Sequence, residues 1–156
     1  CNNLPGLAHF LQKDLDLFSA WCETNRMSLN SNKFSGIPFG RKRSVISFDY
    51  NIAGTSLKRE STIKNLGVLL DSSLSFKDHV GYITSKASKC LGFIFRAAKA
   101  FSDIHCLKTL CCSLVRSTLE YAAVVWAPYY QNSIQQVENI QHKFVRFTTF
   151  AVEWPI

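Results

Sequence analysis

The stretch that decides the fold covers residues 63–101 and reads IKNLGVLLDSSLSFKDHVGYITSKASKCLGFIFRAAKAF. Its first part, residues 63–71, is a mostly apolar run that predicts a strand ending in a turn at Asp71. Gly67 lies inside this run, where the missing side chain would let the backbone approach another group closely. From Phe76 onward, apolar residues recur every three or four positions, which predicts one long helix over 76–101. The chain therefore passes from a β region to an α region.

The predicted helix over 76–101 has two different faces. At 100° per residue, one arc gathers apolar side chains, namely Val80, Ile83, Ala87, Cys90, Leu91, Ile94, Ala98 and Phe101. The opposite arc gathers basic and aromatic side chains, namely Tyr82, Lys86, Lys89, Phe93, Arg96 and Lys99. The first arc predicts a core-facing surface, and the second predicts a basic surface with aromatic rings between the charges.

Two further helices are predicted after this one. Asp103 is a plausible N-cap for a helix over 104–127, which Pro128 would end. Its apolar stripe consists of Leu107, Leu110, Cys111, Leu114, Thr118, Tyr121 and Val125. The last helix is expected over 133–149, with a stripe of Ile134, Val137, Ile140, Gln141, Phe144 and Phe147. The C-terminal half of the chain therefore predicts three helices.

The N-terminal part predicts one helix followed by short strands. A helix over 10–25 would bury a face made of Leu11, Leu15, Phe18 and Cys22, with Trp21 on the same side. From Val45 the period changes to two, so Ile46, Phe48, Tyr50 and Ile52 would share one face of a strand. Residues 53–55 would turn the chain back. Strands and helices are segregated, so we expect an α+β fold with short antiparallel strands followed by three helices.

The charge of the chain is concentrated in its middle. The 156 residues, enough for one domain or two small pieces, carry 18 Lys and Arg against 11 Asp and Glu, a net charge of +7. From Lys33 to Arg116 there are 14 basic and 5 acidic residues, so this segment has +9 and the remainder −2. Such an excess favours nucleic acid as the partner. A merely solvated basic face and an acidic membrane surface are the alternatives.

Several other functions find no support in the sequence. There is no GxSxG, GxxxxGK[ST], GxGxxG or HExxH motif, and no apolar run long enough to span a membrane. Asp14 and Asp16 lie two positions apart on a predicted helix, where they diverge by about 200° and cannot share a metal. The six cysteines have no zinc-like spacing, so we expect them to be reduced and mostly buried. Reduced cysteines indicate an intracellular protein of the nucleus or cytoplasm.

Three groups of residues in a fixed order carry a family resemblance. The first comprises Leu11-Gln12-Lys13-Asp14-Leu15-Asp16, Trp21-Cys22 and Leu29-Asn30-Ser31-Asn32-Lys33. The second comprises Ile63-Lys64-Asn65-Leu66-Gly67-Val68-Leu69-Leu70-Asp71, Leu74-Ser75-Phe76 and His79. The third comprises Leu114-Val115-Arg116-Ser117, Leu119-Glu120-Tyr121 and Val125-Trp126-Ala127-Pro128. Together, over about residues 10–150, they resemble the reverse transcriptases of jockey-like non-LTR retrotransposons.

The resemblance implies a right-hand polymerase that copies RNA into DNA from a primer at a nicked chromosomal target. Residues 1–73 would be the end of the palm with its primer-grip hairpin, 74–150 the helical thumb, and 151–156 a truncated tail.

The resemblance also implies roles for particular residues. Lys33 matches a lysine proposed to protonate the leaving pyrophosphate as a general acid. The primer-grip hairpin is matched by Asn65-Leu66-Gly67-Val68, and we expect Lys64, Asn65, Leu66 and Gly67 to bind nucleic acid there. In the family the thumb as a whole follows the template–primer backbone. From the helical arc we assign this contact to Tyr82, Lys86, Lys89, Arg96 and Lys99.

One departure from the family pattern limits the expected activity. The aromatic-x-Asp-Asp motif that would precede the first helix is missing, as are the fingers. The intact family enzyme would use two Mg²⁺ ions, but we expect no metal and no cofactor in this chain. Its partners would be RNA–DNA or DNA template–primer and the missing palm and fingers, with no membrane. We therefore expect a fragment that grips nucleic acid without polymerising alone; a non-enzymatic nucleic-acid-binding module and a basic interaction protein are the alternatives.

Overall fold

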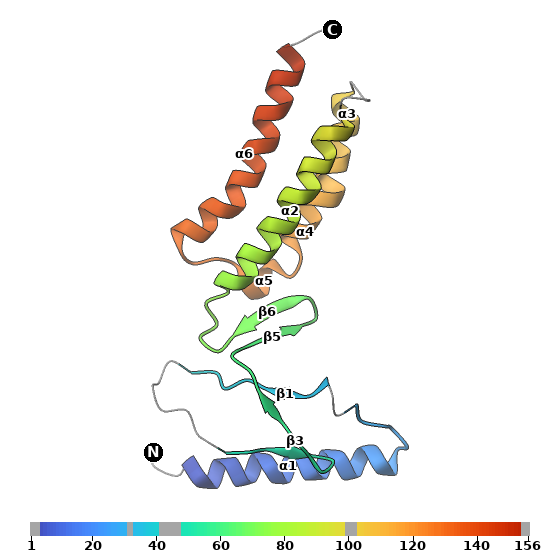
Figure 1. Ribbon diagram of the computed structural model, residues 1–156, viewed down its shortest axis with the longest axis vertical. Helices are drawn as coiled ribbons and strands as arrows, with labels where there is room; N and C mark the ends of the chain where they lie inside the picture. The colour runs from blue at the N-terminus through green and yellow to red at the C-terminus, as the bar shows by residue number, and fades with distance from the viewer. Residues whose placement is uncertain (1–3, 31–32, 41–47, 99–102, 154–156) are drawn as a thin grey trace. The chain divides into compact units, whose positions relative to one another are not determined.

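The computed structural model describes residues 4–30, 33–40, 48–98 and 103–153 as a mixture of helices and short strands (Figure 1). These residues form two compact units. The first consists of residues 1–63 and 71–74, and the second of residues 64–70 and 75–156. The α+β class is thereby confirmed at the level of mixed helix and strand. Each unit has its own interior and is described separately.

The first unit is built on helix α1 (Leu4–Thr24), which begins six residues before the predicted start. Pro5 falls in its first turn, a position where proline costs no hydrogen bond. The buried residues are Ala8 and Cys22, and Leu15 is partly buried. The predicted buried face is therefore right for Cys22 and wrong for Leu11, Phe18 and Trp21, which are exposed. On the same helix, the Gln12 amide pairs with the backbone of Asn51. Its Nε2 donates to Asn51 O (2.8 Å), and its Oε1 accepts from Asn51 N (2.9 Å).

The strands of the first unit are only two residues long. Strand β2 (Asn51–Ile52) pairs antiparallel with β3 (Thr55–Ser56), as the predicted turn requires. Strand β1 (Ser35–Gly36) pairs with β4 (Lys58–Arg59) in parallel, which corrects the expectation of antiparallel strands alone. The predicted strand from Val45 is therefore much shorter than expected, and its first residues up to 47 lie outside the described part.

Strands β5 (Thr62–Asn65) and β6 (Val68–Asp71) form a two-stranded sheet. The sequence pattern predicts one strand over 63–71, and that prediction is wrong, whereas the family resemblance implies a hairpin at these residues. Both turn residues, Leu66 and Gly67, have positive φ angles of 46° and 87°. Two successive left-handed residues are the geometry of a type I′ turn, which reverses the chain within two residues. The tip of this hairpin, residues 64–70, belongs to the second unit.

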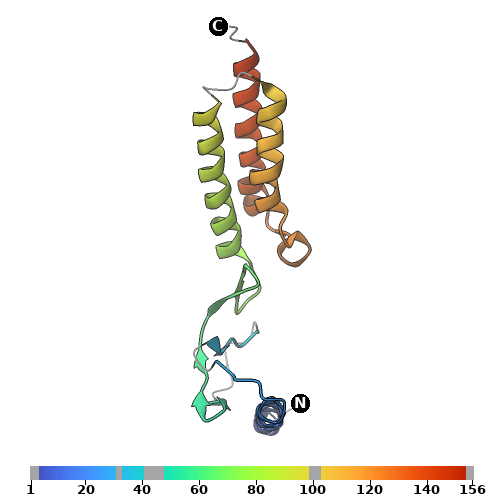
Figure 2. The same ribbon diagram turned by 90° about the vertical axis from the view of Figure 1, so that its right-hand side faces the viewer.

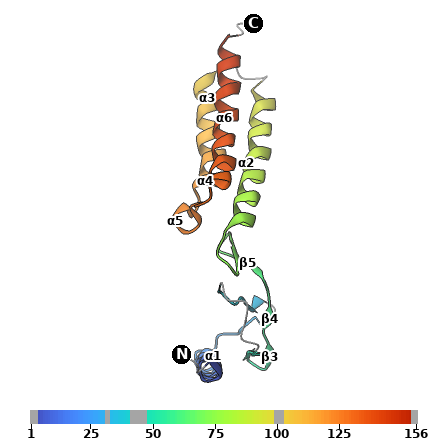
Figure 3. The ribbon, with the colours of Figure 1, turned by 90° about the vertical axis from the view of Figure 1, so that its left-hand side faces the viewer.

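The second unit is a helical bundle in which three long segments lie side by side (Figures 2 and 3). Helix α2 (Lys77–Ala97) runs one way. The chain returns through α3 (Ile104–Leu110), the π-helical segment η2 (Cys111–Arg116) and α4 (Ser117–Glu120). Helix α6 (Gln131–Glu153) runs in the first direction again. The predicted N-cap is confirmed, because the Asp103 carboxylate accepts from the His105 amide at 2.9 Å.

The second of these segments departs from the predicted single helix over 104–127. It ends at Glu120 because Ala122 adopts a left-handed φ of 52°, and a separate short helix α5 (Ala123–Trp126) follows. Within it, η2 has the wider π-helical turn, which inserts about one residue into the repeat. The inward position consequently passes from Leu114, which is 42% exposed, to Val115, which is 2% exposed.

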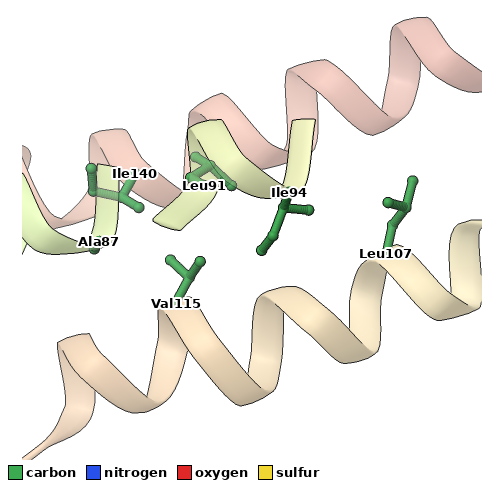
Figure 4. Close-up of a cluster of buried hydrophobic side chains, with 6 residues drawn as sticks. All are labelled: Ala87, Leu91, Ile94, Leu107, Val115 and Ile140. Atoms are coloured by element: carbon green, nitrogen blue, oxygen red, sulfur yellow. The ribbon is translucent and has the colours of Figure 1, made fainter. Parts of the chain in front are cut away.

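The core of the bundle confirms the apolar face of α2. Ala87, Leu91 and Ile94 point toward Leu107 and Val115 of the second segment and Ile140 of α6, as Figure 4 shows. Phe95 of α2 also stacks on Phe147 of α6, with ring centroids 4.1 Å apart. Of the predicted stripe on α6, Ile134, Val137, Ile140, Phe144 and Phe147 are at least half-buried. Gln141 is exposed and was predicted wrongly.

The five cysteines that the structure describes are free, as expected, but they are not mostly buried. Among the described residues Cys22 is buried, Cys90 and Cys111 are partly buried, and Cys106 and Cys112 are exposed. Burial raises the pKa of the Cys111 thiol, with smaller contributions from Cys112 and Cys90. In the described part of the chain, no helix is long and apolar enough to cross a membrane.

Candidate nucleic-acid interface

The tip of the β5–β6 hairpin presents an exposed apolar side chain in an unusual backbone conformation. Leu66 is 84% exposed and has a φ of 46°, a region that costs a residue with a Cβ about 1–2 kcal/mol. Strain of this kind concentrates at functional sites, because it persists only where the surrounding structure imposes it. The hairpin tip is therefore the first candidate contact surface of the second unit.

Tyr121 is the residue that contacts this tip. Its hydroxyl donates to the carbonyl oxygen of Leu66 at 2.9 Å, across 55 residues of sequence. Its ring lies against Gly67, so close that a Cβ built there would be 3.3 Å from Cε1 of Tyr121. The close approach predicted for Gly67 is thereby confirmed, and its partner is a tyrosine ring of the helical bundle.

A buried pair of rings anchors the same hairpin on its other side. The Leu69 amide donates to Nδ1 of His79 at 3.3 Å, and the His79 ring meets the Trp126 ring edge-on, with centroids 5.3 Å apart. Trp126 in turn donates from Nε1 to the carbonyl oxygen of Tyr121 at 2.7 Å. His79 and Trp126 are 1% and 2% exposed, and Trp126 packs with Val68 in a hydrophobic cluster. A continuous path of contacts therefore runs from Leu69 through His79, Trp126 and Tyr121 to Leu66.

His79 is held neutral in this arrangement. Burial lowers the pKa of its imidazole from the ordinary value of 6.5, because the charged form would lose its hydration. Since Nδ1 accepts from the Leu69 amide, the proton of the neutral ring is on Nε2. That nitrogen is buried and has no hydrogen-bond partner among the described residues. The ring can therefore accept from the hairpin only while it remains uncharged.

The basic face of α2 begins beside the hairpin. Lys64 of β5 donates from Nζ to the hydroxyl of Tyr82 on α2 at 3.4 Å, and the same Nζ lies 5.1 Å from the ring centroid. Tyr82 and Phe93 are 41% and 58% exposed. The cations on this face are also exposed, and they are Lys86, Lys89 and Arg96. The predicted separation of this helix into an apolar face and a basic, aromatic face is therefore present in the structure.

The structure brings together some of the predicted site residues and leaves others apart. Lys64 contacts Tyr82 at the start of α2, whereas Leu66 and Gly67 at the hairpin tip contact Tyr121. Lys33 belongs to the first unit, where it is exposed and its amide donates to Asn30 O at 3.0 Å. Lys99 lies outside the described residues. The described ranges contain no cluster of three His, Cys, Asp or Glu that could hold a metal ion.

The residues that support the hairpin are not apparent from the sequence pattern. Tyr121 was assigned to a core stripe, yet it is 57% exposed and turns toward Leu66. His79 and Trp126 were noticed only as part of a resemblance. The signal that could have identified them is the spacing of Tyr121 and Trp126, since five residues do not fit one face of a regular helix.

Comparison with known proteins gives one significant similarity. The chain is 25% identical over 139 residues to a probable RNA-directed DNA polymerase from transposon X-element of Drosophila melanogaster. The match covers 88% of this chain but only 15% of that protein. No family model matches the chain, and no solved structure matches it. The similarity relates this chain to a transposon reverse transcriptase.

Proposed function

We propose that the second unit of this chain grips the template–primer duplex of a non-LTR retrotransposon reverse transcriptase, as part of its palm and thumb. The similarity to a transposon RNA-directed DNA polymerase supports the parent activity. The chain spans about 15% of that polymerase, so the activity of the whole enzyme is part of the proposal. The contact surface would consist of the α2 basic face, defined as Tyr82, Lys86, Lys89, Phe93 and Arg96, together with the hairpin tip.

The observation that carries this proposal is the form of the α2 basic face. From Tyr82 to Arg96 it extends about 21 Å, at about 1.5 Å per residue. A duplex strand places one phosphate about every 3.4 Å along its axis, so this length matches about six phosphates. Lysine and arginine side chains neutralise phosphates without reading bases, as a polymerase must do on any template. The two exposed rings could rest on sugars between the charges.

The hairpin tip would contact the primer end beside this face. Lys64 joins the tip to Tyr82, so a strand that follows α2 would reach the turn at Leu66. An exposed leucine suits the apolar face of a sugar or terminal base. Asn65, which is exposed beside the turn, would meet the same strand end.

Other elements of the proposal concern the parent polymerase. Lys33 would act as the general acid toward pyrophosphate. The two Mg²⁺ ions of the intact enzyme do not fit the residues described here, because no suitable cluster exists among them. The remaining palm and fingers would supply that site. Copying at a chromosomal target would place the protein in the nucleus, with the cytoplasm as its site of synthesis.

The test is fluorescence anisotropy of the full chain with a short RNA–DNA duplex that has a recessed primer end, titrated across salt. The variant Lys86→Ala/Lys89→Ala/Arg96→Ala removes three cations from the α2 basic face. A matched control, Lys108→Ala/Lys143→Ala/Arg146→Ala, removes two lysines and one arginine that are also exposed in the second unit. If all three face residues contact phosphates, the slope of log affinity against log salt falls by about 2.7 in the first variant.

The outcomes separate the proposal from its alternatives. Equal losses in both variants would mean that net charge alone attracts the duplex, which contradicts a specific face. Equal affinity for duplexes with and without a recessed primer end would favour a general nucleic-acid-binding module. Absence of binding at low salt would favour a basic surface for an acidic protein. A primer-extension reaction with Mg²⁺ accompanies the titration, and extension by the chain alone would contradict a missing catalytic centre.

A further inference from the structure

The turn at the hairpin tip has a sequence that does not favour its own conformation. Type I′ turns strongly prefer Asn-Gly or Asp-Gly at the two central positions, because both residues need positive φ. Here the first central residue is Leu66, with a φ of 46°, and Leu66 is 84% exposed. Gly67 suits the second central position, but neither side-chain packing nor local propensity accounts for Leu66 at the first, so we look to contacts from elsewhere in the chain.

Tyr121, 55 residues later in the sequence, supplies those contacts. Its hydroxyl satisfies the carbonyl of Leu66, and its ring covers Gly67. The phenol is directed at the tip by a break in the helix, since Tyr121 is extended (ψ 123°) and Ala122 is left-handed. Both sides of the contact thus depend on a strained residue, Leu66 on one side and Ala122 on the other.

Trp126 fixes the position of Tyr121. Its Nε1 donates to the Tyr121 carbonyl at 2.7 Å, and its buried ring is held among Val68, Val80 and Ile83. The tyrosine backbone is therefore attached to a rigid cluster, while its side chain reaches out to an exposed turn. Tyr121 therefore has the geometry expected of a residue that positions another one, because the rigid core fixes where its side chain contacts the exposed turn.

We propose that Tyr121 is a positioning residue for nucleic-acid binding, which holds the Leu66–Gly67 turn in the left-handed form that presents Leu66 to the primer end. The proposal rests on the proposed function for its ligand. The conformational part stands independently, because the order of the turn can be measured without nucleic acid. Tyr121 itself need not touch the ligand.

The central test is Tyr121→Phe, which keeps the ring against Gly67 and removes the hydroxyl that donates to Leu66. The matched control is Tyr129→Phe, because Tyr129 is 92% exposed and its hydroxyl has no contact described here with the hairpin. Amide hydrogen exchange at residues 66–69 should accelerate about fivefold in Tyr121→Phe, the equilibrium equivalent of one net hydrogen bond. Exchange in the core of α2 should not change. Affinity for the recessed RNA–DNA duplex should fall by a similar factor, and the control should match the parent chain.

A second variant tests whether Tyr121 acts through the turn. Leu66→Asn creates the Asn-Gly pair that favours a type I′ turn by itself. In that background Tyr121→Phe should accelerate tip exchange by much less than fivefold. This comparison uses exchange alone, because Leu66→Asn also removes the proposed contact side chain.

The results distinguish failure of this inference from failure of the proposed function. If tip exchange is unchanged in Tyr121→Phe, or changes equally in the Leu66→Asn background, Tyr121 does not hold the turn. If the tip loosens but duplex affinity is unchanged, the turn is held by Tyr121 without serving binding, and the proposal is overturned. If the parent chain does not bind the duplex, the proposed function fails instead, and the exchange experiment still decides the role of Tyr121 in the turn.

Discussion

The π-helical segment η2 leads to a prediction about mutant stability that is the opposite of what the sequence periodicity would give. A regular helix from Leu107 would turn Leu114 into the core, whereas the structure buries Val115 to 2% exposure and leaves Leu114 42% exposed. We therefore predict that Val115→Ala destabilises the second unit more than Leu114→Ala does. The smaller truncation should have the larger effect.

The magnitudes follow from the buried carbon atoms. Val115→Ala removes two buried methyl groups, which is about 1.6 kcal/mol of transfer free energy plus a cavity term, or about 2 kcal/mol in total. Leu114→Ala removes three carbons from a side chain that is 42% exposed, so the transfer cost is about 1.4 kcal/mol at most. The gap opens to solvent and alanine favours a helix, which brings the net cost to about 1 kcal/mol or less.

The assay is urea unfolding of both variants, followed by far-ultraviolet circular dichroism and supported by thermal melts. A loss of about 2 kcal/mol should lower the Tm of a unit of this size by about 8–16 °C. The m-value should stay unchanged, since neither variant alters the surface exposed on unfolding. A larger cost for Leu114→Ala than for Val115→Ala would refute the reasoning and restore a regular α-helix over this segment.

Three further predictions concern the hairpin and the cysteines. His79 has a lowered pKa in the folded state, so its contribution to the free energy of unfolding should be complete above pH 6.5. Below pH 6.5 that free energy should fall by at most about 1.4 kcal/mol per pH unit. Denaturation at several pH values should show a shallower decline for His79→Asn. Gly67→Ala should destabilise the second unit by about 1–2 kcal/mol in urea unfolding, because φ is +87° and a tyrosine ring lies 3.3 Å from the new methyl group, whereas Gly81→Ala on α2, with open space around it, should be neutral or stabilising. Cys106 should react with a thiol reagent in the native protein and Cys22 only after unfolding; equal native labelling followed by peptide mass spectrometry would contradict the burial.

The positions of the helices were predictable where one helix buries one face by itself. The buried residues of α2 match its sequence periodicity, because the arc is wide and the helix contains no internal break. The Asp103 N-cap was also predictable from the sequence, since it depends on a side chain and an amide only two residues apart. Such features are predictable because the interactions that produce them join residues close together in the sequence.

Prediction failed where a distant residue changes a local preference. Helix α1 leaves Leu11 and Phe18 exposed, and its Gln12 pairs instead with the backbone of Asn51, 39 residues away. The run over 63–71 has the composition of a single strand. The tight turn at Leu66 is held by contacts with distant residues, among them Tyr121, 55 positions away.

The candidate interface divides in the same way. The sequence by itself determined the cations and rings on one face of α2, because the spacing of residues on a helix fixes their common direction. Only the tertiary structure decided that Lys64 meets Tyr82, that Tyr121 holds the hairpin tip, and that His79 and Trp126 anchor it from inside. These contacts join residues 10 to 55 positions apart through strained turns and a buried cluster. The free energy of these contacts arises from packing and hydrogen bonds between segments far apart in the sequence, so no local sequence pattern could predict them.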